Sequence, residues 1–333
     1  MRYVIIGGSA AAIGCIEGVR SVDKTGEIIL ITGETEWNYS RPLISYLLEG
    51  KTTRDKMWCR PDSFFTRNGV TVKAGVLATA LDAGDRTVRL STGERLAYDR
   101  LLAATGSRPF VPPIPGLETV ERTFCFQTLS DASALAEALR PESRVLILGA
   151  GLTGVKCAEG IRGLCAQIAI ADLAPRVLPA VLDDTAAAMV QARMEEKGVR
   201  FYLNDSAAAF RGNTARLQSG TELEFDVLVT AVGVRPNTQL VADAGGAVDR
   251  GILVDGRCAT TLPDVYAAGD CAQGYDAVSG EKRMLPLWPN AVLQGETAGI
   301  NMAGGRADYT QGIALNASGV FGLHMVTAGS YEG

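Results

Sequence analysis

The sequence predicts an α/β protein with two similar parallel-sheet domains. Three observations support this prediction: a strand–turn–helix–strand pattern occurs twice, each copy holds a loop of small residues, and each copy is followed by an apolar strand that ends in Gly-x-Arg-Pro. Strands that alternate with helices across glycine-rich turns are typical of parallel sheets. We therefore expect two Rossmann-like domains, each a three-layer ββα arrangement.

The first copy lies at the N-terminus. A short apolar strand pattern (residues 3–6) leads into a small-residue loop (7–12), and a helical pattern and a second apolar strand (28–32) follow. Glu34 comes directly afterwards, 27 residues after Gly7. In dinucleotide-binding folds an acidic residue about 20 residues after the glycine turn accepts hydrogen bonds from a ribose diol. Glu34 is therefore expected to bind a ribose.

The second copy repeats this plan in the middle of the chain. An apolar strand pattern (145–148) leads into a loop (149–154), then a helical pattern runs to about residue 164 and a strand covers 167–171. Asp172 follows, 23 residues after Gly149. A carboxylate at this place pairs with the 2′-OH of NAD and repels the 2′-phosphate of NADP. We therefore expect NADH to be preferred over NADPH, although Arg176 could soften the repulsion.

Both loops are suited to a pyrophosphate. A strand-to-helix turn aims free backbone N–H groups and the positive end of the helix dipole at the phosphates. Glycines allow the tight turn, the approach of the phosphate and the contact of helix with strand. The second loop has Gly149, Gly151 and Gly154 at these positions, and the first has Gly7, Ser9 and Ala12. Taken alone, the degenerate first loop is equally consistent with an ordinary strand-to-helix turn.

Each half closes in the same way. Residues 106–109 and 233–236 both read Gly-x-Arg-Pro, and proline turns the chain out of a sheet, so each is expected to be a domain exit. Pro-rich residues 112–116 are expected to be a stiff linker into the second half. Between loop and exit we expect small antiparallel flaps that pair residues 69–73 with 86–90 and residues 199–203 with 215–217.

Composition excludes several other classes. A net charge of −5 without a Lys/Arg run argues against a nucleic-acid partner. The only histidine is His324, so neither a histidine-built metal site nor a histidine-dependent triad is expected, and no metal is assigned. The seven cysteines form no Cys-x-x-Cys pair, which favours free thiols in a reducing compartment. With no signal peptide or membrane-spanning stretch in view, we expect a cytoplasmic protein without membrane insertion.

Three further motifs extend the pattern. Residues 39–45 read Tyr-Ser-Arg-Pro-Leu-Ile-Ser, residues 105–106 form a Thr-Gly turn, and residues 261–270 read Thr-Leu-Pro-Asp-Val-Tyr-Ala-Ala-Gly-Asp. With these motifs the chain resembles the FAD-dependent pyridine nucleotide–disulfide oxidoreductase superfamily over nearly its whole length. Within that superfamily it is most similar to NADH:rubredoxin reductases, ferredoxin reductases and the flavin module of assimilatory nitrite reductase.

The resemblance implies a nested arrangement of domains. The first loop would bind FAD and the second would bind NADH, with the NAD(H) domain (110–231) inserted into a discontinuous FAD domain (1–109 and 232–305). Residues 306–333 would be an incomplete C-terminal interface domain, a short β stub. Family-style dimerisation through that domain is therefore in doubt.

The resemblance also assigns residues to the cofactors. Residues 39–45 would cross the FAD pyrophosphate and run under the flavin, Asp270 would hold the ribitol chain, and the helix starting at Trp288 would face the flavin pyrimidine with its positive end. The backbone of Ala78 would contact the adenine. The expected cofactor-binding residues are Gly7, Ser9, Ala11, Ala12, Glu34, Arg41, Pro42, Ala78, Thr105, Gly106, Asp270, Trp288, Gly149, Gly151, Leu152, Thr153, Gly154, Asp172 and Gly233.

Two departures from the family bear on catalysis. The place of the redox cysteine of disulfide reductases falls near Pro42, and no cysteine lies between Cys15 and Cys59, so electrons would leave the flavin directly. The family's glutamate two residues after the third glycine is replaced by Lys156, and its flavin-side lysine by Tyr46. Our hypothesis is that Lys156 supplies the cation near flavin N5, and the alternative is an ordinary surface charge.

The counter-ion expected for this lysine is Glu159 or Glu49. Arg41 is the second residue to which we assign a catalytic role, because the resemblance places its positive charge beside the flavin cofactor. Neither Arg41 nor Lys156 is expected to act as a nucleophile, since electron transfer through a flavin needs none.

These inferences lead to one function and three alternatives. The chain is expected to pass hydride from NADH to FAD and then single electrons to an iron–sulfur or rubredoxin-type protein. One alternative is a thiol-free NADH oxidase that uses dioxygen. Another is the flavin electron-entry subunit of a larger metalloenzyme complex. The third is a non-enzymatic sensor of adenosine nucleotides, whose flavin would not be bleached by NADH.

Overall fold

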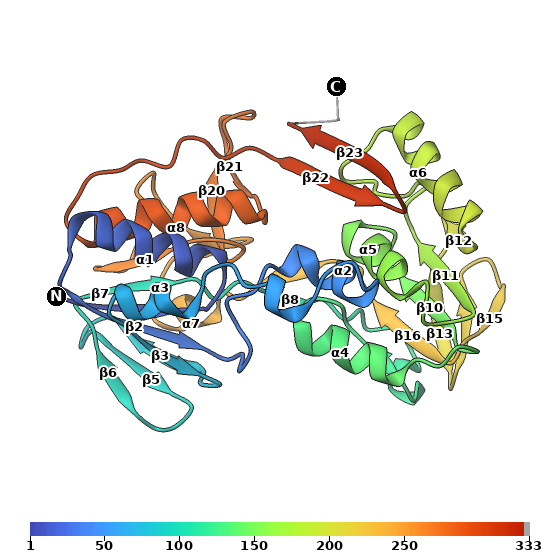
Figure 1. Cartoon of the computed structure of the whole chain (residues 1–333), viewed down its shortest axis with the longest axis horizontal. Coiled ribbons are helices and arrows are strands. Elements are labelled where there is room, and N and C mark those ends of the chain that lie inside the picture. Colours follow the sequence, from blue (N-terminus) through green and yellow to red (C-terminus); the bar gives the residue numbers. More distant parts are fainter. Residues whose placement is uncertain (330–333) are drawn as a thin grey trace.

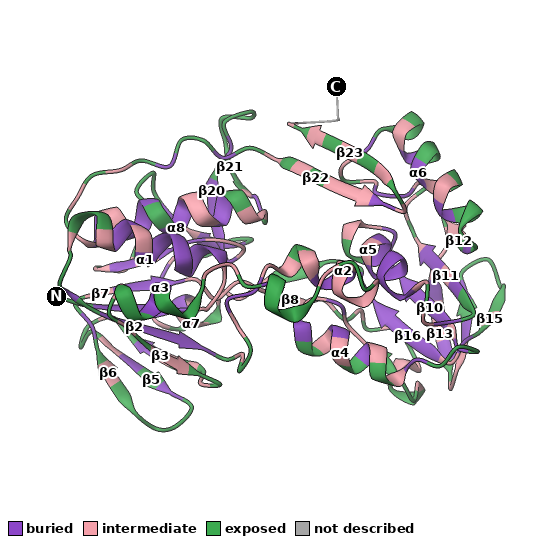
Figure 2. Cartoon of the chain, viewed as in Figure 1, coloured by how far each residue is buried: buried purple, intermediate pink, exposed green. Residues whose placement is uncertain are grey.

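The computed structural model describes residues 1–329. It confirms the α/β prediction: two sheets of five parallel strands lie in two lobes side by side, each flanked by helices (Figure 1). Apolar side chains fill the space between sheets and helices, and the buried residues follow the strands in both lobes (Figure 2). Among the described residues, no helix is long and apolar enough to cross a membrane.

The first sheet has the strand order β19-β7-β1-β2-β3. The strand that leads into the first small-residue loop, β1, therefore lies at its centre. Both faces of a parallel sheet are covered, so its strands read as continuous apolar runs; residues 3–6 are buried for this reason. The strands are β1 (Arg2–Ile6), β2 (Glu27–Thr32), β3 (Val70–Ala74), β7 (Arg100–Ala103) and β19 (Val265–Ala267).

The second sheet repeats this order as β12-β11-β10-β16-β9, with β10 in the place of β1. All strands of the first sheet lie within 1–109 or 232–305 and all strands of the second within 110–231. The division into domains at these boundaries remains our proposal. The strands are β9 (Thr123–Phe124), β10 (Arg144–Leu148), β11 (Gln167–Asp172), β12 (Val199–Leu203) and β16 (Val227–Thr230).

The prediction of two antiparallel flaps is wrong for the first strand of each predicted pair, residues 69–73 and residues 199–203. Residues 69–73 and 199–203 contribute β3 and β12, which extend the two sheets by parallel pairing with β2 and β11. An alternating pattern fits a sheet edge as well as a hairpin, so periodicity alone does not choose the partner. The antiparallel flaps are β4 (Ala78–Asp82), β5 (Thr87–Leu90) and β6 (Arg95–Ala97), and β13 (Ala207–Arg211), β14 (Thr214–Leu217) and β15 (Glu222–Glu224).

Two helices cover one face of the first sheet, α1 (Ala10–Val22) and α8 (Trp288–Met302). Glycines bring their backbones together: a Cβ on Gly14 would lie 2.2 Å from the Val292 carbonyl oxygen, and one on Gly295 would lie 2.0 Å from that of Ala11. Close approach of this kind needs glycine. Because α8 is fixed against α1, the N-terminus of α8 is held beside the first loop (Figure 1).

The short helix α2 (Ile44–Leu48) belongs to the N-terminal part of the chain but packs in the second lobe (Figure 1). Ile44 is buried in the same core as Val155 of α5, and a Cβ on Gly160 of α5 would lie 3.1 Å from the Ser45 carbonyl oxygen. The segment around Arg41 thus crosses from one lobe to the other. The helices of the second lobe are α4 (Leu129–Ala138), α5 (Leu152–Ile161) and α6 (Asp184–Glu196).

Two strands connect the lobes, β8 (Ser107–Pro109) and β17 (Val234–Pro236). They carry the two predicted exits and pair with each other in antiparallel register, with Arg108 opposite Arg235. Prolines suit this place because a two-stranded ribbon leaves their missing N–H groups at an edge. The two exits therefore form one double crossing between the lobes.

The C-terminal segment forms the hairpin β22 (Leu315–Val320) and β23 (Leu323–Ala328), which lies beside α5 of the second lobe (Figure 1). It is part of the expected C-terminal stub, of which residues 330–333 lie outside the described residues. The remaining elements are α3 (Asp62–Arg67), α7 (Gln239–Asp243), β18 (Ile252–Leu253), β20 (Ala272–Tyr275), β21 (Lys282–Met284) and the 3₁₀ turns at Arg41–Leu43, Arg54–Lys56 and Leu117–Thr119.

Candidate functional site

The first loop joins β1 to α1 at the carboxyl end of the first sheet. Gly7 has a φ of 120°, and a Cβ there would lie 2.0 Å from the Ala104 carbonyl oxygen, so only glycine fits. Ser9 is the N-cap residue of α1, but its side chain makes no capping hydrogen bond and the first turn has no acidic residue. Ala11 and Ala12 are buried in that turn. The positive end of α1 is therefore open to an anion.

The second loop joins β10 to α5 in the same way. Gly149 has a φ of 110°, and a Cβ on Gly154 would lie 2.0 Å from the Gly149 carbonyl oxygen. Gly151 differs, because apart from the adjoining residues no atom of the described chain lies within 4 Å of the place of its Cβ. It is the N-cap residue of α5, which lacks a side-chain cap. Gly149 and Gly154 are thus needed for packing, while Gly151 faces open space where a phosphate would fit.

The two acidic residues lie just past the second strand of each unit. Glu34 forms an ion pair with Arg41 and accepts a 2.6 Å hydrogen bond from the Tyr39 hydroxyl. Asp172 accepts hydrogen bonds from the backbone N–H groups of Ala150, at 2.6 Å, and Ala174, at 2.7 Å. Asp172 therefore lies against its own glycine loop, and Glu34 lines a small pocket together with Gly8 and Ser9 of the first loop.

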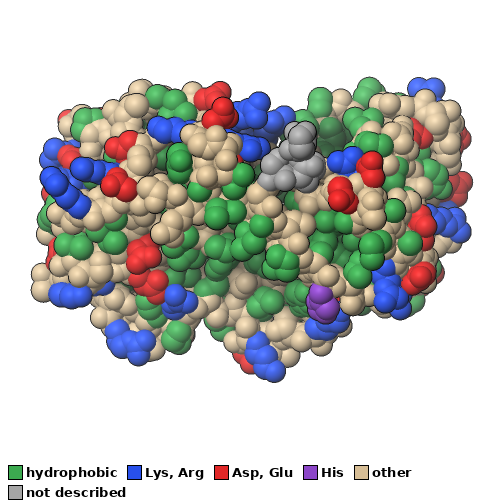
Figure 3. Space-filling model, turned by 90° about the horizontal axis from the view of Figure 1, so that it is seen from above, with side chains coloured by type: hydrophobic (Ala, Val, Ile, Leu, Met, Phe, Trp, Pro, Cys, Tyr) green, Lys and Arg blue, Asp and Glu red, His purple; other side chains and the backbone are tan. Residues whose placement is uncertain are grey.

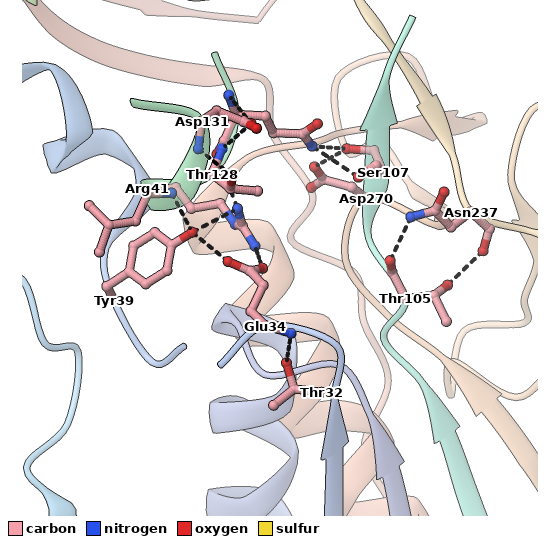
Figure 4. A network of polar contacts seen from close by, with 12 residues as sticks. Thr32, Glu34, Tyr39, Arg41, Thr105, Ser107, Thr128, Asp131, Asn237 and Asp270 are labelled. Atoms are coloured by element: carbon pink, nitrogen blue, oxygen red, sulfur yellow. Dashed lines mark hydrogen bonds and ion pairs between the residues drawn. The ribbon is translucent and has the colours of Figure 1, made fainter. Parts of the chain in front are cut away.

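A polar network joins the lobes beside the first loop (Figure 4). Arg41 donates to the Gln127 carbonyl oxygen at 3.0 Å, and the Gln127 side-chain amide donates to the Ser107 carbonyl oxygen at 2.9 Å. The amide oxygen of Gln127 is buried and has no hydrogen-bond partner within the described chain. A buried acceptor of this kind requires a donor, which a bound ligand can supply. The network thus leaves an unpaired hydrogen-bond acceptor, the Gln127 amide oxygen, between Arg41 and Ser107.

Asp270 lies at the opposite end of this network (Figure 4). Ser107 Oγ donates a 3.1 Å hydrogen bond to its carboxylate. Burial raises the pKa of Asp270 above its ordinary value, and the Ser107 hydrogen bond and the charge of Arg41 oppose that rise. Two further hydrogen bonds lie next to it, at the double crossing. Thr105 Oγ1 donates to the Asn237 carbonyl oxygen at 2.6 Å, and the Asn237 side-chain amide donates to the Thr105 carbonyl oxygen at 2.9 Å. Residues 261–270, the second FAD fingerprint that the family resemblance predicts, thus meet the Thr-Gly turn in space.

Lys156 lies on α5 and forms an ion pair with Glu159, one of the two counter-ions expected. Glu49, the other, pairs with Lys51. The Lys156 ammonium lies 4.3 Å from the centre of the Tyr46 ring, so it faces α2 rather than bulk solvent. The lysine and the tyrosine that replace the family's charge pair therefore touch each other. Contact of Lys156 with flavin remains a proposal.

The remaining predicted site residues lie in turns, at helix starts and in the first flap. Pro42 lies in the turn that starts at Arg41, Thr153 and Leu152 in the first turn of α5, and Trp288 at the start of α8. Gly106 and Gly233 have positive φ and no neighbour of the described chain within 4 Å of a Cβ. Ala78 starts the first flap and does not line the small pocket at Glu34, whose walls are Gly8, Ser9, Glu34, Trp37, Asn38, Tyr39 and Arg41.

The sequence reasoning missed three residues that join the site together: Gln127, Ser107 and Asn237. Each makes its hydrogen bonds to residues distant in the chain, such as Asn237 to Thr105. One local signal was present for Gln127, which precedes the capping box formed by Thr128 and Asp131. A capping box marks a helix start but does not indicate a ligand.

These residues fit two dinucleotide cofactors. Each sheet ends in an uncapped helix N-terminus with a carboxylate beside it, which is the donor and acceptor set for one pyrophosphate and one ribose. Beside the first loop lie Asp270 and the unpaired oxygen of Gln127, which comes from the second lobe, and both could bond to the additional polar chain of a flavin cofactor. The placement of FAD in the first lobe and NAD(H) in the second remains our proposal.

The chain is similar to known proteins along almost its whole length. A family model described as pyridine nucleotide-disulphide oxidoreductase matches residues 1–295. The chain is 34% identical over 335 residues to the NADH-dependent phenylglyoxylate dehydrogenase subunit epsilon of Aromatoleum evansii, covering 99% of this chain and 79% of that protein. It is 30% identical over 337 residues to the assimilatory nitrate reductase electron transfer subunit of Bacillus subtilis (strain 168), covering 99% of this chain but 43% of that protein.

A solved structure is similar as well. A chain of the crystal structure of the covalent putidaredoxin reductase–putidaredoxin complex superposes with a TM-score of 0.92 at 26% identity, covering 100% of this chain and 82% of that chain. The match of the family model over most of the chain and the identity to the first relative confirm the resemblance found in the motifs. The chain belongs to the pyridine nucleotide-disulphide oxidoreductase family.

Proposed function

We propose that this protein is a FAD-dependent NADH oxidoreductase that delivers electrons singly to an iron–sulfur or rubredoxin-type protein. The observation that carries the proposal is the pair of equivalent glycine loops, each at the carboxyl end of the central strand of its own sheet, with Glu34 in a pocket beside the first loop and Asp172 bonded to the second. Ligands of α/β sheets bind at this edge of the strands. Two such edges in one chain supply a site for each cofactor.

A bound FAD would take an electron pair from NADH as hydride and release the electrons one at a time. The work of the chain is to bind and orient. Backbone N–H groups at the starts of α1 and α5 hold the two pyrophosphates, and Glu34 and Asp172 hold the riboses. Asp270 would accept hydrogen bonds from the ribitol hydroxyls, and Lys156 would supply a positive charge to the flavin.

Asp172 determines the choice of nicotinamide cofactor in this proposal. Its carboxylate is already fixed by two backbone N–H groups, so it cannot turn away from a 2′-phosphate without losing both bonds. Arg176 does not neutralise it, because Arg176 donates to the Leu182 carbonyl oxygen at 3.1 Å and pairs with Asp184 at 3.0 Å. NADH is therefore the preferred donor and NADPH is disfavoured.

Thiol chemistry has no part in the proposed reaction. All seven cysteines are free, and burial raises the pKa of Cys59, one of the two that are not fully buried, to about 11. A thiol with such a pKa is almost wholly protonated at neutral pH and is a poor nucleophile. Free cysteines also support a cytoplasmic location as part of this proposal, since reducing compartments keep thiols unpaired.

The acceptor can be tested by anaerobic turnover with NADH. We expect rapid electron transfer to a rubredoxin or a small iron–sulfur protein, measured by the change in absorbance of its iron centre, and slow consumption of oxygen when air is the only acceptor. Fast oxygen consumption together with no reduction of any iron protein would instead assign the chain as a thiol-free NADH oxidase.

A second candidate function is an electron-entry subunit of a larger metalloenzyme. It is favoured by the names of two relatives, of which one is a dehydrogenase subunit and the other an electron transfer subunit. Native mass spectrometry on protein purified from its own cells distinguishes the two. A stable complex with a metal-containing chain supports the subunit role, and a free chain supports the independent reductase.

A further inference from the structure

Three parts of the chain meet around Lys156: helix α5, helix α2 and the turn of the C-terminal hairpin. The ion pair between Lys156 and Glu159 is enclosed there, with side-chain exposures of 13% and 1%. An enclosed ion pair is costly to bury unless its remaining hydrogen-bonding capacity is satisfied. The partners that satisfy it therefore decide where the lysine lies.

The hairpin turn supplies those partners through its backbone. The N–H of Phe321 donates a 2.6 Å hydrogen bond to Glu159 Oε1, and the Lys156 ammonium donates a 2.9 Å hydrogen bond to the Gly319 carbonyl oxygen. Both members of the ion pair are thus bonded to residues 319–322, which are the end of β22 and the two-residue hairpin turn that follows it. Backbone groups of a turn cannot rotate away independently, so they fix both side chains at once.

Tyr46 closes the other side of this arrangement. The Lys156 ammonium lies 4.3 Å from the centre of its ring, within the range of a cation–π contact. The Tyr46 hydroxyl lies 3.5 Å from the place of a Cβ on Gly319, so the turn and the ring are in contact across the lysine. Lys156 is consequently held by Glu159 of α5, by Tyr46 of α2 and by Gly319 of the C-terminal hairpin.

The hairpin packs on the core of the second lobe through its turn and through Leu323 and Met325 of β23. Val320 is fully buried in the core of the second lobe, whereas Val326 on the outer face of β23 is 72% exposed. Hydrophobic side chains gather across the middle of the molecular face on this side (Figure 3). An isolated two-stranded hairpin is only marginally stable in water. The turn at 319–322 is therefore both one of its anchors and its contact with the ion pair.

We infer that Glu159 and the hairpin turn 319–322 are positioning elements for the Lys156 cation, so that the C-terminal segment takes part in flavin reduction. The inference rests on the proposed function, in which Lys156 acts at the flavin. Glu159 and the turn would not touch the cofactor. They would act by holding the ammonium at one place beside Tyr46, and loosening either would let the charge move away from the reacting ring.

Two variants loosen the arrangement without removing the lysine. Glu159→Gln replaces the charged acceptor of the Phe321 N–H by a weaker neutral one and removes the charge that fixes Lys156, and Phe321→Gly frees the turn, where φ is already 47°. The double variant Lys156→Met/Glu159→Gln removes the whole pair without leaving a lone buried charge. The matched control is Glu196→Gln, which breaks an exposed ion pair to Arg193 with the same spacing on α6.

The test has one readout on the chain and one on the cofactor. Amide hydrogen exchange of residues 319–322 in the full chain is expected to accelerate in Glu159→Gln and Phe321→Gly and to stay unchanged in Glu196→Gln. Anaerobic stopped-flow reduction of bound FAD by NADH is expected to slow about tenfold in both loosening variants, because a small displacement of a positioned group has a large effect on rate. The apparent dissociation constant for NADH is expected to stay unchanged.

The outcomes separate this inference from the proposed function. Faster exchange in the turn with a normal rate of FAD reduction, while the double variant is slow, would overturn the positioning role but leave Lys156 as the flavin cation. A normal rate in the double variant would remove the proposed role of Lys156 and the inference with it. Unchanged exchange in Glu159→Gln would show that the turn is not anchored by Glu159 and would also overturn the inference.

Discussion

Ser107 donates a 3.1 Å hydrogen bond to the carboxylate of Asp270, which lies 163 positions later in the chain. The two residues belong to different motifs, the Thr-Gly turn region and the end of the second predicted FAD fingerprint. Burial raises the pKa of Asp270, so the folded chain binds a proton there more tightly than the unfolded chain does. Ionised Asp270 therefore opposes folding of the ligand-free chain.

Replacing Asp270 by Asn should separate stability from cofactor binding. In protein stripped of FAD, Asp270→Asn is expected to raise the melting temperature at pH 7, because the buried charge is removed. The gain should shrink as the pH falls through the raised pKa and vanish below the ordinary carboxylate range, where the native residue is protonated in both states. Thermal unfolding across pH measures this.

The same variant should bind FAD about 10- to 100-fold more weakly, since hydrogen bonds to a charged acceptor contribute about 1.5–3 kcal/mol. Equilibrium dialysis with FAD gives the affinity. A variant that is both less stable at pH 7 and normal in FAD affinity would contradict the ribitol-binding role of Asp270.

Two glycines of the second loop should respond differently to alanine. Gly154→Ala places a Cβ 2.0 Å from the Gly149 carbonyl oxygen, so we expect a loss of about 1–3 kcal/mol of unfolding free energy. Gly151→Ala meets open space and has a φ of −74°, so stability should not change. Its KM for NADH should rise about tenfold or more, because the methyl group takes the place of a phosphate.

Thermal unfolding and steady-state kinetics on the two variants give both quantities. The pair acts as its own control, since the substitution is the same and the positions are three residues apart. A normal KM for NADH in Gly151→Ala would argue against a pyrophosphate at this loop.

Asp172→Asn should reduce the preference for NADH over NADPH. The amide loses the charge-assisted hydrogen bonds to the ribose hydroxyls, so kcat/KM for NADH should fall about tenfold or more, while the value for NADPH should fall less because its 2′-phosphate is no longer repelled. Steady-state kinetics with both donors checks the ratio. An unchanged ratio would place the adenosine ribose away from Asp172.

Removing the more accessible thiols should leave the reaction intact. Cys59→Ser and Cys125→Ser are expected to reduce FAD with NADH within about twofold of the unmodified chain, since no thiolate is required and burial raises the pKa of Cys59 to about 11. Anaerobic stopped-flow absorbance measures the rate. A loss of the reaction on alkylation, absent from the serine variants, would indicate a thiol that takes part.

Local signals predicted the two loops and their acids because all their determinants lie within about 30 residues. Gly7, Gly149 and Gly154 are required by turns that the sequence itself encodes, and Glu34 and Asp172 follow strands that apolar runs reveal. The double crossing was also indicated, since both exits carry the same Gly-x-Arg-Pro motif and these pair with each other.

Contacts between distant segments could not be predicted in the same way. The docking of Ile44 and Ser45 on α5, the bridge of Gln127 to Ser107, and the hold of the C-terminal turn on Glu159 all depend on where the lobes lie. The flap partners were missed for a related reason, because an alternating polar and apolar pattern does not indicate which strand will pair with it. Spacing and periodicity describe one element at a time, whereas these contacts arise from packing.

The most direct test of the account is an anaerobic absorbance titration of the purified chain with NADH. We predict that the chain retains one yellow FAD and that one equivalent of NADH bleaches its visible band, while Gly151→Ala needs a higher NADH concentration to do so. A chain that takes up no flavin, or whose bound flavin is not bleached by NADH, would contradict the claim that one polypeptide holds both cofactors with their reactive rings in contact.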